Sequence, residues 1–201
     1  MGREAAEAAA RRAERTGDAY DELMADGARY LSKRDTRRAA RAFREAIALR
    51  PDRPEAYFNL GAALNDSAHL VEAAQRFLEA KERWPVGSED WAKATAAAFN
   101  LLTVEACDEV AKPEWWNDEG LKALSARVVR AAPNDGQANC MRAVVLSGPT
   151  DNTWGAGPRS AAEFKEAATY YERAAALCNA PAIEADLAGR ATWCRSRADA
   201  M

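Results

Sequence analysis

The chain has 201 residues with 28 Lys and Arg against 31 Asp and Glu, and its net charge of −3 argues against general binding to nucleic acids, which favours basic surfaces. Hydrophobic residues make up 48% and aromatic residues only 8%, and much of the hydrophobic share is alanine, which favours closely packed helices. No apolar run approaches the roughly 20 residues that cross a bilayer, so we expect no membrane span.

The cysteines carry no sign of metal binding. They form no Cys-x-x-Cys pair, and the single histidine, His69, has no cluster of metal ligands around it. We therefore expect reduced, structural cysteines, no metal and no cofactor. This predicts an intracellular reducing compartment, with the cytoplasm as the first choice and an organelle lumen or stroma left open. The cysteines are Cys107, Cys140, Cys178 and Cys194.

The start of the chain has weak helical character. Residues 3–15 are rich in Ala, Arg and Glu, which predicts a helix, although its apolar face is too small to bury much surface. The segment lacks the apolar core of a signal peptide. We expect residues 1–19 to be an N-terminal helical extension.

Residues 20–53 have apolar positions at helical spacing. Helices are predicted at about 19–32 and 36–49, with Asp35 or Thr36 as the N-cap of the second. The following segment, 54–87, has the same organisation.

The second segment carries its own boundary signals. Asp52 and Glu55 have capping-box spacing, and Pro85 with Gly87 ends the segment.

One pattern is therefore written twice, with an offset of 34 residues that points to a helical repeat array. Small residues in it allow two helix backbones to approach, and aromatic rings fill the space beside them. The matched pairs are Ala39 and Ala73, Phe43 and Phe77, Ala46 and Ala80, and Pro51 and Pro85.

These residues resemble the tetratricopeptide repeat (TPR) family. The resemblance covers about a third of the chain, and it implies an all-α, right-handed superhelical solenoid of antiparallel helix pairs. The first segment departs from the family pattern at Asp26, where leucine is usual, and at Leu23, which replaces an aromatic residue. The matching residues are Gly27, Tyr30, Ala39, Phe43, Ala46 and Pro51 in the first repeat, and Tyr57, Leu60, Gly61, Ala73, Phe77, Ala80 and Pro85 in the second.

A third, degenerate repeat is expected at 88–135. Its first helix is predicted to run on past Leu102 towards Val110, and a second helix follows at about 117–131. The interruption between them holds Trp115 and Trp116 and makes this unit longer than the standard repeat.

A fourth, degenerate repeat is expected at 136–180, with a helix at about 135–147, an inserted loop at 147–159 and a helix near 160–178. Ser160 and Glu163 have the spacing of a capping box for that last helix.

The final segment, 181–201, is predicted to be a capping helix that covers the last repeat. Ile183, Leu187, Ala191 and Cys194 are expected on its buried side. Together these segments predict a single TPR-like domain over 20–201.

The family resemblance implies that the first helix of each pair lines a concave groove for a peptide or a partner's helix. The alternative is that the same positions are ordinary exposed helix residues, and we favour the groove because solenoids generally use their concave surface. The family's groove positions are Asp21, Met24, Ala28 and Leu31 in the first repeat, Glu55, Phe58, Asn59, Ala62 and Asn65 in the second, and Glu89, Ala92, Lys93 and Ala96 in the third.

One subclass of the family binds the C-terminal carboxylates of chaperones with a clamp of Lys, Asn, Asn, Lys and Arg. This chain has Met24, Ala28, Asn59, Glu89 and Lys93 at those positions. Only Asn59 matches, and Glu89 would repel a carboxylate. The clamp is therefore largely absent.

Three tryptophans lie where the chain departs from the repeat pattern: Trp115, Trp116 and Trp154. Tryptophan is enriched at interaction hot spots, so they are candidate anchors for a partner. Equally, they can pack back and close the insertions over the solenoid, and their burial decides between these alternatives.

These patterns predict a non-catalytic interaction or scaffold protein with a protein or peptide partner, bound by the groove or by the insertions. The alternative is a permanent structural subunit of a larger assembly. An enzyme on a helical scaffold is less favoured, because His69 has no nucleophile beside it and no phosphate-binding glycine loop is present.

Overall fold

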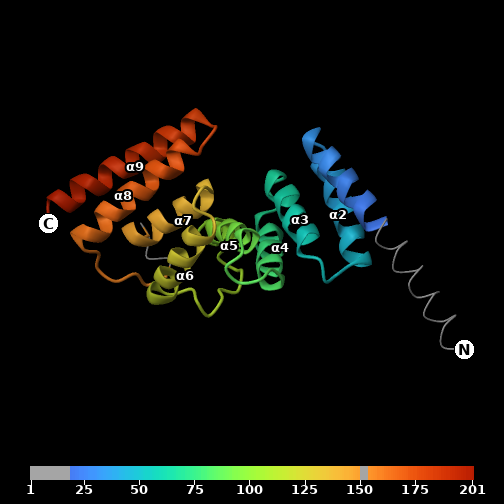
Figure 1. Cartoon of the computed structure of the whole chain (residues 1–201), viewed down its shortest axis with the longest axis horizontal. Helices are drawn as coiled ribbons and strands as arrows, with labels where there is room; N and C mark the ends of the chain where they lie inside the picture. The colour runs from blue at the N-terminus through green and yellow to red at the C-terminus, as the bar shows by residue number, and fades with distance from the viewer. Residues whose placement is uncertain (1–18, 150–153) are drawn as a thin grey trace, which may run out of the picture. The chain divides into compact units, whose positions relative to one another are not determined.

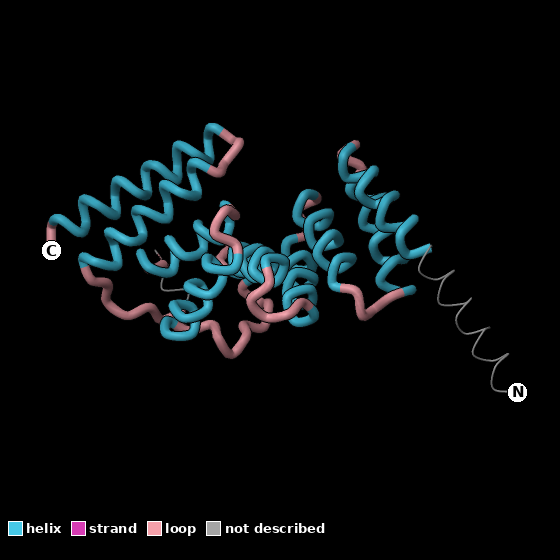
Figure 2. Tube along the Cα trace, in the orientation of Figure 1, coloured by secondary structure: helices cyan, strands magenta, loops and turns pink. Residues whose placement is uncertain are grey.

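The regular secondary structure of the described residues is helical (Figures 1 and 2). The structure is a computed structural model, and it describes residues 19–149 and 154–201. The helix predicted at 3–15 lies outside the described residues. The chain divides into two compact units, Met1–Arg83 and Trp84–Met201, and each is described by itself. The expectation of one domain over 20–201 stays a prediction.

The first unit contains two helix pairs. Residues 19–32 form the first helix, followed by α2 at Thr36–Leu49. The second pair is α3 at Pro54–Asp66 and α4 at Leu70–Arg83. Neighbouring helices along the chain pack on one another, α2 on α3 and α3 on α4. The predicted positions of the first two helices are confirmed.

Close helix approach in this unit depends on two glycines. A Cβ atom placed on Gly61 would lie 2.9 Å from the ring of Phe77, and one placed on Gly27 would overlap the ring of Phe43. Phe43 is fully buried and Phe77 is 5% exposed. The prediction that glycine makes room for the facing phenylalanine is confirmed in both pairs.

The start of α3 differs from the prediction. The N-cap is Arg53, whose side chain makes no capping hydrogen bond, so the expected capping box of Asp52 and Glu55 is wrong. Pro54 occupies the first helical position, where its missing N–H costs nothing because that N–H would have no helical acceptor. Glu55 instead forms an ion pair with Arg53, with Nε and Oε2 3.1 Å apart.

The second unit contains the irregular half of the chain. Its helices pack in sequence, α5 on α6 and α7, α6 on α7, α7 on α8, and α8 on α9. Figure 1 shows α8 and α9 lying side by side along their lengths. The elements are α5 at Glu89–Leu102, the 3₁₀ turn η1 at Glu105–Cys107, α6 at Asp118–Ala131, α7 at Gly136–Ser147, α8 at Ala161–Ala176 and α9 at Pro181–Asp199.

Helix α5 ends at Leu102, so the predicted extension towards Val110 is wrong. The ammonium of Lys112 donates to the carbonyl of Leu102 at 2.8 Å and to that of Cys107 at 3.2 Å. The Leu102 carbonyl would otherwise receive the backbone N–H four residues further along the helix. Lys112, which follows the break in the chain, therefore supplies the hydrogen bond that the last carbonyl of α5 would otherwise lack.

The later boundaries agree with the sequence signals. Asp135 caps α7, and Ser160 with Glu163 forms the expected capping box of α8. On α9, Leu187 and Cys194 are buried as expected, whereas Ile183, expected on the same side, is 56% exposed.

Candidate functional site: groove positions and a cleft beside α9

The groove positions of the first unit lie on one side of each first helix. On residues 19–32, Asp21 and Ala28 are exposed, and Met24 and Leu31 are half-buried. The buried Tyr20 of this helix packs with Ala46 of α2 and Ala56 of α3, so the three helices meet at this end. On α3, the positions with partial exposure are Glu55, Phe58, Asn59 and Ala62, and Asn65 is exposed.

Two of these side chains already have partners within the unit. The ring of Phe58 packs edge-on against that of Phe77, with centroids 5.2 Å apart. Glu55 pairs with Arg53. The groove role of these positions stays a prediction.

In the second unit, the groove positions on α5 differ from one another. Ala92 and Ala96 are fully buried in one apolar cluster, so their expected place in an open groove is wrong. Glu89 is exposed, and its carboxylate lies 2.6 Å from the ammonium of the half-buried Lys93. This hydrogen bond raises the pKa of Lys93 and occupies the one basic side chain of the incomplete clamp.

The three tryptophans of the insertions form one aromatic cluster on α5. Trp116 and Trp154 lie 5.5 and 5.9 Å from the ring of Phe99, and Trp115 lies 5.8 Å from Trp116 (ring centroids). Trp154 is only 7% exposed, while the other two are partly buried. These contacts favour internal packing for Trp154, because a partner has little of its surface to contact.

The loop that carries Trp154 is held by Arg159. Its guanidinium donates to the carboxylate of Asp118, with Nη1 and Oδ2 2.9 Å apart, and to the carbonyl of Val145 at 3.0 Å. Arg159 is itself buried. The loop is therefore fixed to the start of α6 and to α7.

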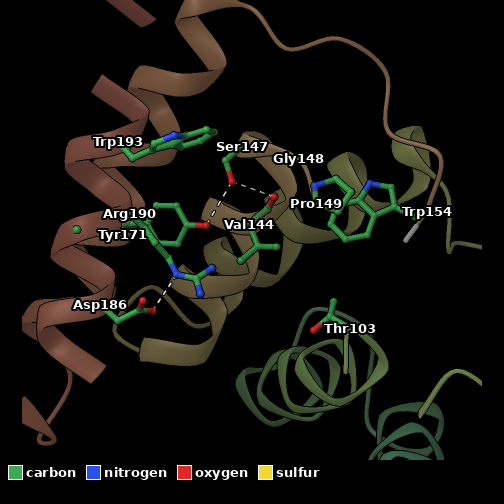
Figure 3. A pocket seen from close by; sticks show the side chains of 11 residues that line it. Thr103, Val144, Ser147, Gly148, Pro149, Trp154, Tyr171, Asp186, Arg190 and Trp193 are labelled. Carbon is green, nitrogen blue, oxygen red and sulfur yellow. Dashed lines mark hydrogen bonds and ion pairs between the residues drawn. The ribbon is translucent and has the colours of Figure 1, made fainter. Parts of the chain in front are cut away.

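A cleft of about 920 Å³ lies in the second unit, beside α9 (Figure 3). Side chains from α7, α8 and α9 contribute most of its wall, and Thr103, just after α5, closes one side. The described residues that line it are Thr103, Val144, Ser147, Gly148, Pro149, Trp154, Tyr171, Asp186, Gly189, Arg190 and Trp193.

Polar groups from three helices converge in this cleft. Nε of Arg190 donates to Oδ2 of Asp186 at 2.8 Å, one helical turn away on α9. The hydroxyls of Ser147 on α7 and Tyr171 on α8 lie 3.3 Å apart. Burial raises the pKa of the Tyr171 hydroxyl, so this group stays protonated and can donate a hydrogen bond. Figure 3 shows the terminal nitrogens of Arg190 extending away from Asp186 towards Val144.

The apolar part of the α9 wall is Trp193. Its side chain is 56% exposed, and its ring packs edge-on against Phe164 of α8 with centroids 5.7 Å apart. This contact holds the ring in place while more than half of its surface stays open. An exposed, fixed indole is suited to binding an apolar side chain.

Sequence reasoning missed the polar and aromatic residues of the α9 wall. Asp186, Arg190 and Trp193 follow one another at spacings of four and three residues, which places them on one helical face. Leu187, Ala191 and Cys194 form the buried face of the same helix. The helical spacing of Asp186, Arg190 and Trp193, next to the buried face, was the sequence signal that could have identified this wall.

The arrangement offers binding groups and little catalytic chemistry. Among the described residues, no group of three His, Cys, Asp or Glu side chains is placed to hold a metal ion. The described lining of the cleft contains one carboxylate, one guanidinium and three hydroxyls, without histidine or cysteine. No described helix has both the length and the apolar character that membrane spanning requires.

Comparison with known proteins gives similarity at the level of structure. No protein-family model matches the sequence, and no curated protein matches it. A crystal structure of MamA protein has a TM-score of 0.55 at 15% identity, covering 90% of this chain and 91% of that one. YrrB, a TPR protein with an unusual peptide-binding site, has a TM-score of 0.51 at 14% identity, covering 87% and 85%. These likenesses and the helix pairs show that the chain has the TPR-type helical-repeat fold.

Proposed function

We propose that this chain is a non-catalytic protein-interaction module that holds a segment of a partner protein, in the first unit on the first helices of its helix pairs. In the second unit the contact is the cleft beside α9. The observation that carries the proposal is the half-exposed Trp193 on the wall of a 920 Å³ cleft. A volume of this size exceeds a single side chain and suits several residues of a peptide.

The chemistry of the cleft supports binding over catalysis. Arg190 already neutralises Asp186, the one carboxylate among the described lining residues. The hydroxyls of Ser147 and Tyr171 lie against one another, and the lining residues that the structure describes include no histidine. The peptide-binding site of YrrB gives a fold-level analogy for the same kind of work.

The groove positions of the first unit belong to the same proposal. Asp21, Ala28 and Asn65 are exposed, and Asn59 is half-buried. Phe58 adds a partly exposed ring that Phe77 supports from below.

Site-specific photo-crosslinking in the full chain tests the proposal. A benzophenone amino acid replaces Trp193, Phe58, Trp116 or, as a control on the exposed end of α6, Arg130. We expect one partner protein to crosslink at position 193, at position 58 or at both, and not at position 130. Crosslinks at position 116 alone would contradict the proposal and favour the insertions. A partner that stays bound in fixed stoichiometry through purification would indicate the alternative, a structural subunit.

A further inference from the structure

We propose that the cleft beside α9 recognises a partner segment in which an acidic side chain lies next to a large apolar side chain. The carboxylate binds Arg190, and the apolar side chain packs on Trp193. This inference rests on the proposed function, and it names the chemistry of the segment that the cleft receives.

Arg190 has hydrogen-bonding capacity beyond its contacts with Asp186 and with the hydroxyl of Tyr171. Its pair with Asp186 engages Nε, with 2.8 Å between Nε and Oδ2. The side chain is 52% exposed, and its terminal nitrogens extend into the cleft (Figure 3). A guanidinium presents five N–H donors in a planar fork, so the end with two terminal nitrogens can accept a second carboxylate.

Two hydroxyl groups surround the guanidinium of Arg190 in the cleft. The hydroxyls of Tyr171 and Ser147 lie at the same end of the cleft, on α8 and α7. The Ser147 hydroxyl donates to the carbonyl of Val144 and lies 3.3 Å from that of Tyr171, so the guanidinium is the main donor left for a ligand. A carboxylate is an acceptor only and therefore matches it. A cationic side chain at this position would instead meet Arg190, while Asp186 is already paired.

The spacing of Arg190 and Trp193 on α9 sets the spacing of the two side chains that the partner must present. Arg190 and Trp193 are three residues apart on α9, which brings their Cβ atoms to about 5–6 Å from each other. Side chains two residues apart in an extended chain are about 6.6 Å apart and point the same way. The matching partner motif is therefore an acidic residue, any residue, and then a large apolar residue.

The α9 wall leaves space for the partner's backbone at Gly189. Gly189 lies between Asp186 and Trp193 on the wall, and a Cβ atom placed on it would have no described atom within 4 Å outside the local backbone of α9. The partner chain can approach α9 at this point. The wall from residue 186 to residue 193 spans about 10 Å, at 1.5 Å per residue, which is the length of about three extended residues.

The test is selection from a library of random ten-residue peptides with both ends blocked, using the full chain. We expect enrichment of Asp or Glu two residues before Phe, Leu, Trp or Met. Anisotropy with one selected peptide then measures affinity. We expect a loss of about tenfold or more when its acid becomes the amide, and a similar loss for the Trp193→Ala variant.

Two arginine variants provide the matched comparison on the same helix. Arg190→Lys keeps the charge and removes the planar fork, and we expect at least a fivefold loss of affinity. Arg197→Lys makes the same exchange outside the cleft, and we expect unchanged affinity. In the Arg190→Lys variant, the difference in affinity between the acid and amide peptides should shrink, because the two-nitrogen contact is gone while the charge remains.

Several outcomes would overturn the inference. These are selection without acidic residues, equal affinity for the acid and amide peptides in the unaltered chain, or binding that requires a free C-terminal carboxylate. If any of these occurs while a partner still crosslinks at position 193, the proposed function stands and only the recognition chemistry is wrong. If no peptide is selected and no crosslink forms at position 193, both the proposed function of the cleft and its recognition chemistry are wrong.

Discussion

Arg159 and Asp118 are joined across 41 residues of sequence by their side chains, with Nη1 and Oδ2 2.9 Å apart. The side chain of Arg159 is 4% exposed and that of Asp118 is 24% exposed. Lys122 adds ion pairs to Asp118 and to Glu163, which belongs to the capping box of α8. This network connects the start of α6, the loop that carries Trp154 and the start of α8.

We expect Asp118→Asn to destabilise the second unit by about 3 kcal/mol, because a buried guanidinium would lose its counter-charge. Urea unfolding followed by tryptophan fluorescence measures this unit, since the six tryptophans of the chain all lie in it. Glu172→Gln, which breaks the more exposed pair with Arg195 in the same unit, is the matched control and should cost less than about 1 kcal/mol. A loss for Asp118→Asn no larger than this control would show that the network contributes little.

The same network predicts a loss of stability in acid. The hydrogen bond from Arg159 lowers the pKa of Asp118 from 3.8 to about 2. For Glu163, burial alone would raise the pKa, but hydrogen bonds from Lys122 and Ser160 outweigh it and lower the pKa from 4.5 to about 2. Because both values are lower in the folded state, the stabilisation is fully present above about pH 5 and declines as the pH falls towards 2.

Urea unfolding at a series of pH values from 7 to 2 measures this decline. We expect Glu163→Gln to flatten the curve between pH 5 and 2, because the titrating group is removed. A variant at the exposed Glu119, next to Asp118 but outside the network, should keep the slope of the unaltered chain. Parallel curves for the Glu163 variant and the unaltered chain would contradict the assignment.

The sequence predicted the regular elements well because their signals are local. Gly61 and Phe77 belong to a pattern repeated at a fixed offset, and the capping box of Ser160 and Glu163 spans three residues. The end of α5 was missed because the group that satisfies Leu102 is Lys112, ten residues later. Local periodicity contains no information about such a contact.

The candidate site was predictable only in part. The family's groove positions direct attention to the first helix of each pair, and Trp154 was recognised as a feature of the inserted loop. The burial of Trp154 depends on Arg159 reaching Asp118, and the cleft depends on Tyr171 and Arg190 meeting from two helices. Both relationships arise from packing between segments far apart in sequence.

Gly61→Trp should unfold the first unit, because a Cβ atom alone would already lie 2.9 Å from Phe77. We expect a clear loss of helical circular dichroism and of the thermal transition of that unit. Gly189→Ala is the comparison at a helical glycine with no atom near its Cβ, and it should keep or slightly raise the melting temperature through better helix propensity. Native helicity and melting temperature in Gly61→Trp would count against the close helix approach and the repeat register.

Trp154→Ala and Trp193→Ala should separate packing from recognition. Trp154 is 7% exposed and lies in the cluster with Phe99, so its truncation should cost about 3–5 kcal/mol of unfolding free energy. Trp193 is 56% exposed, so its truncation should cost under about 1 kcal/mol while weakening peptide binding. Urea unfolding followed by far-ultraviolet circular dichroism, together with peptide anisotropy, measures both effects. If instead Trp154→Ala leaves stability unchanged and removes binding, Trp154 is a partner anchor and its internal packing is dispensable.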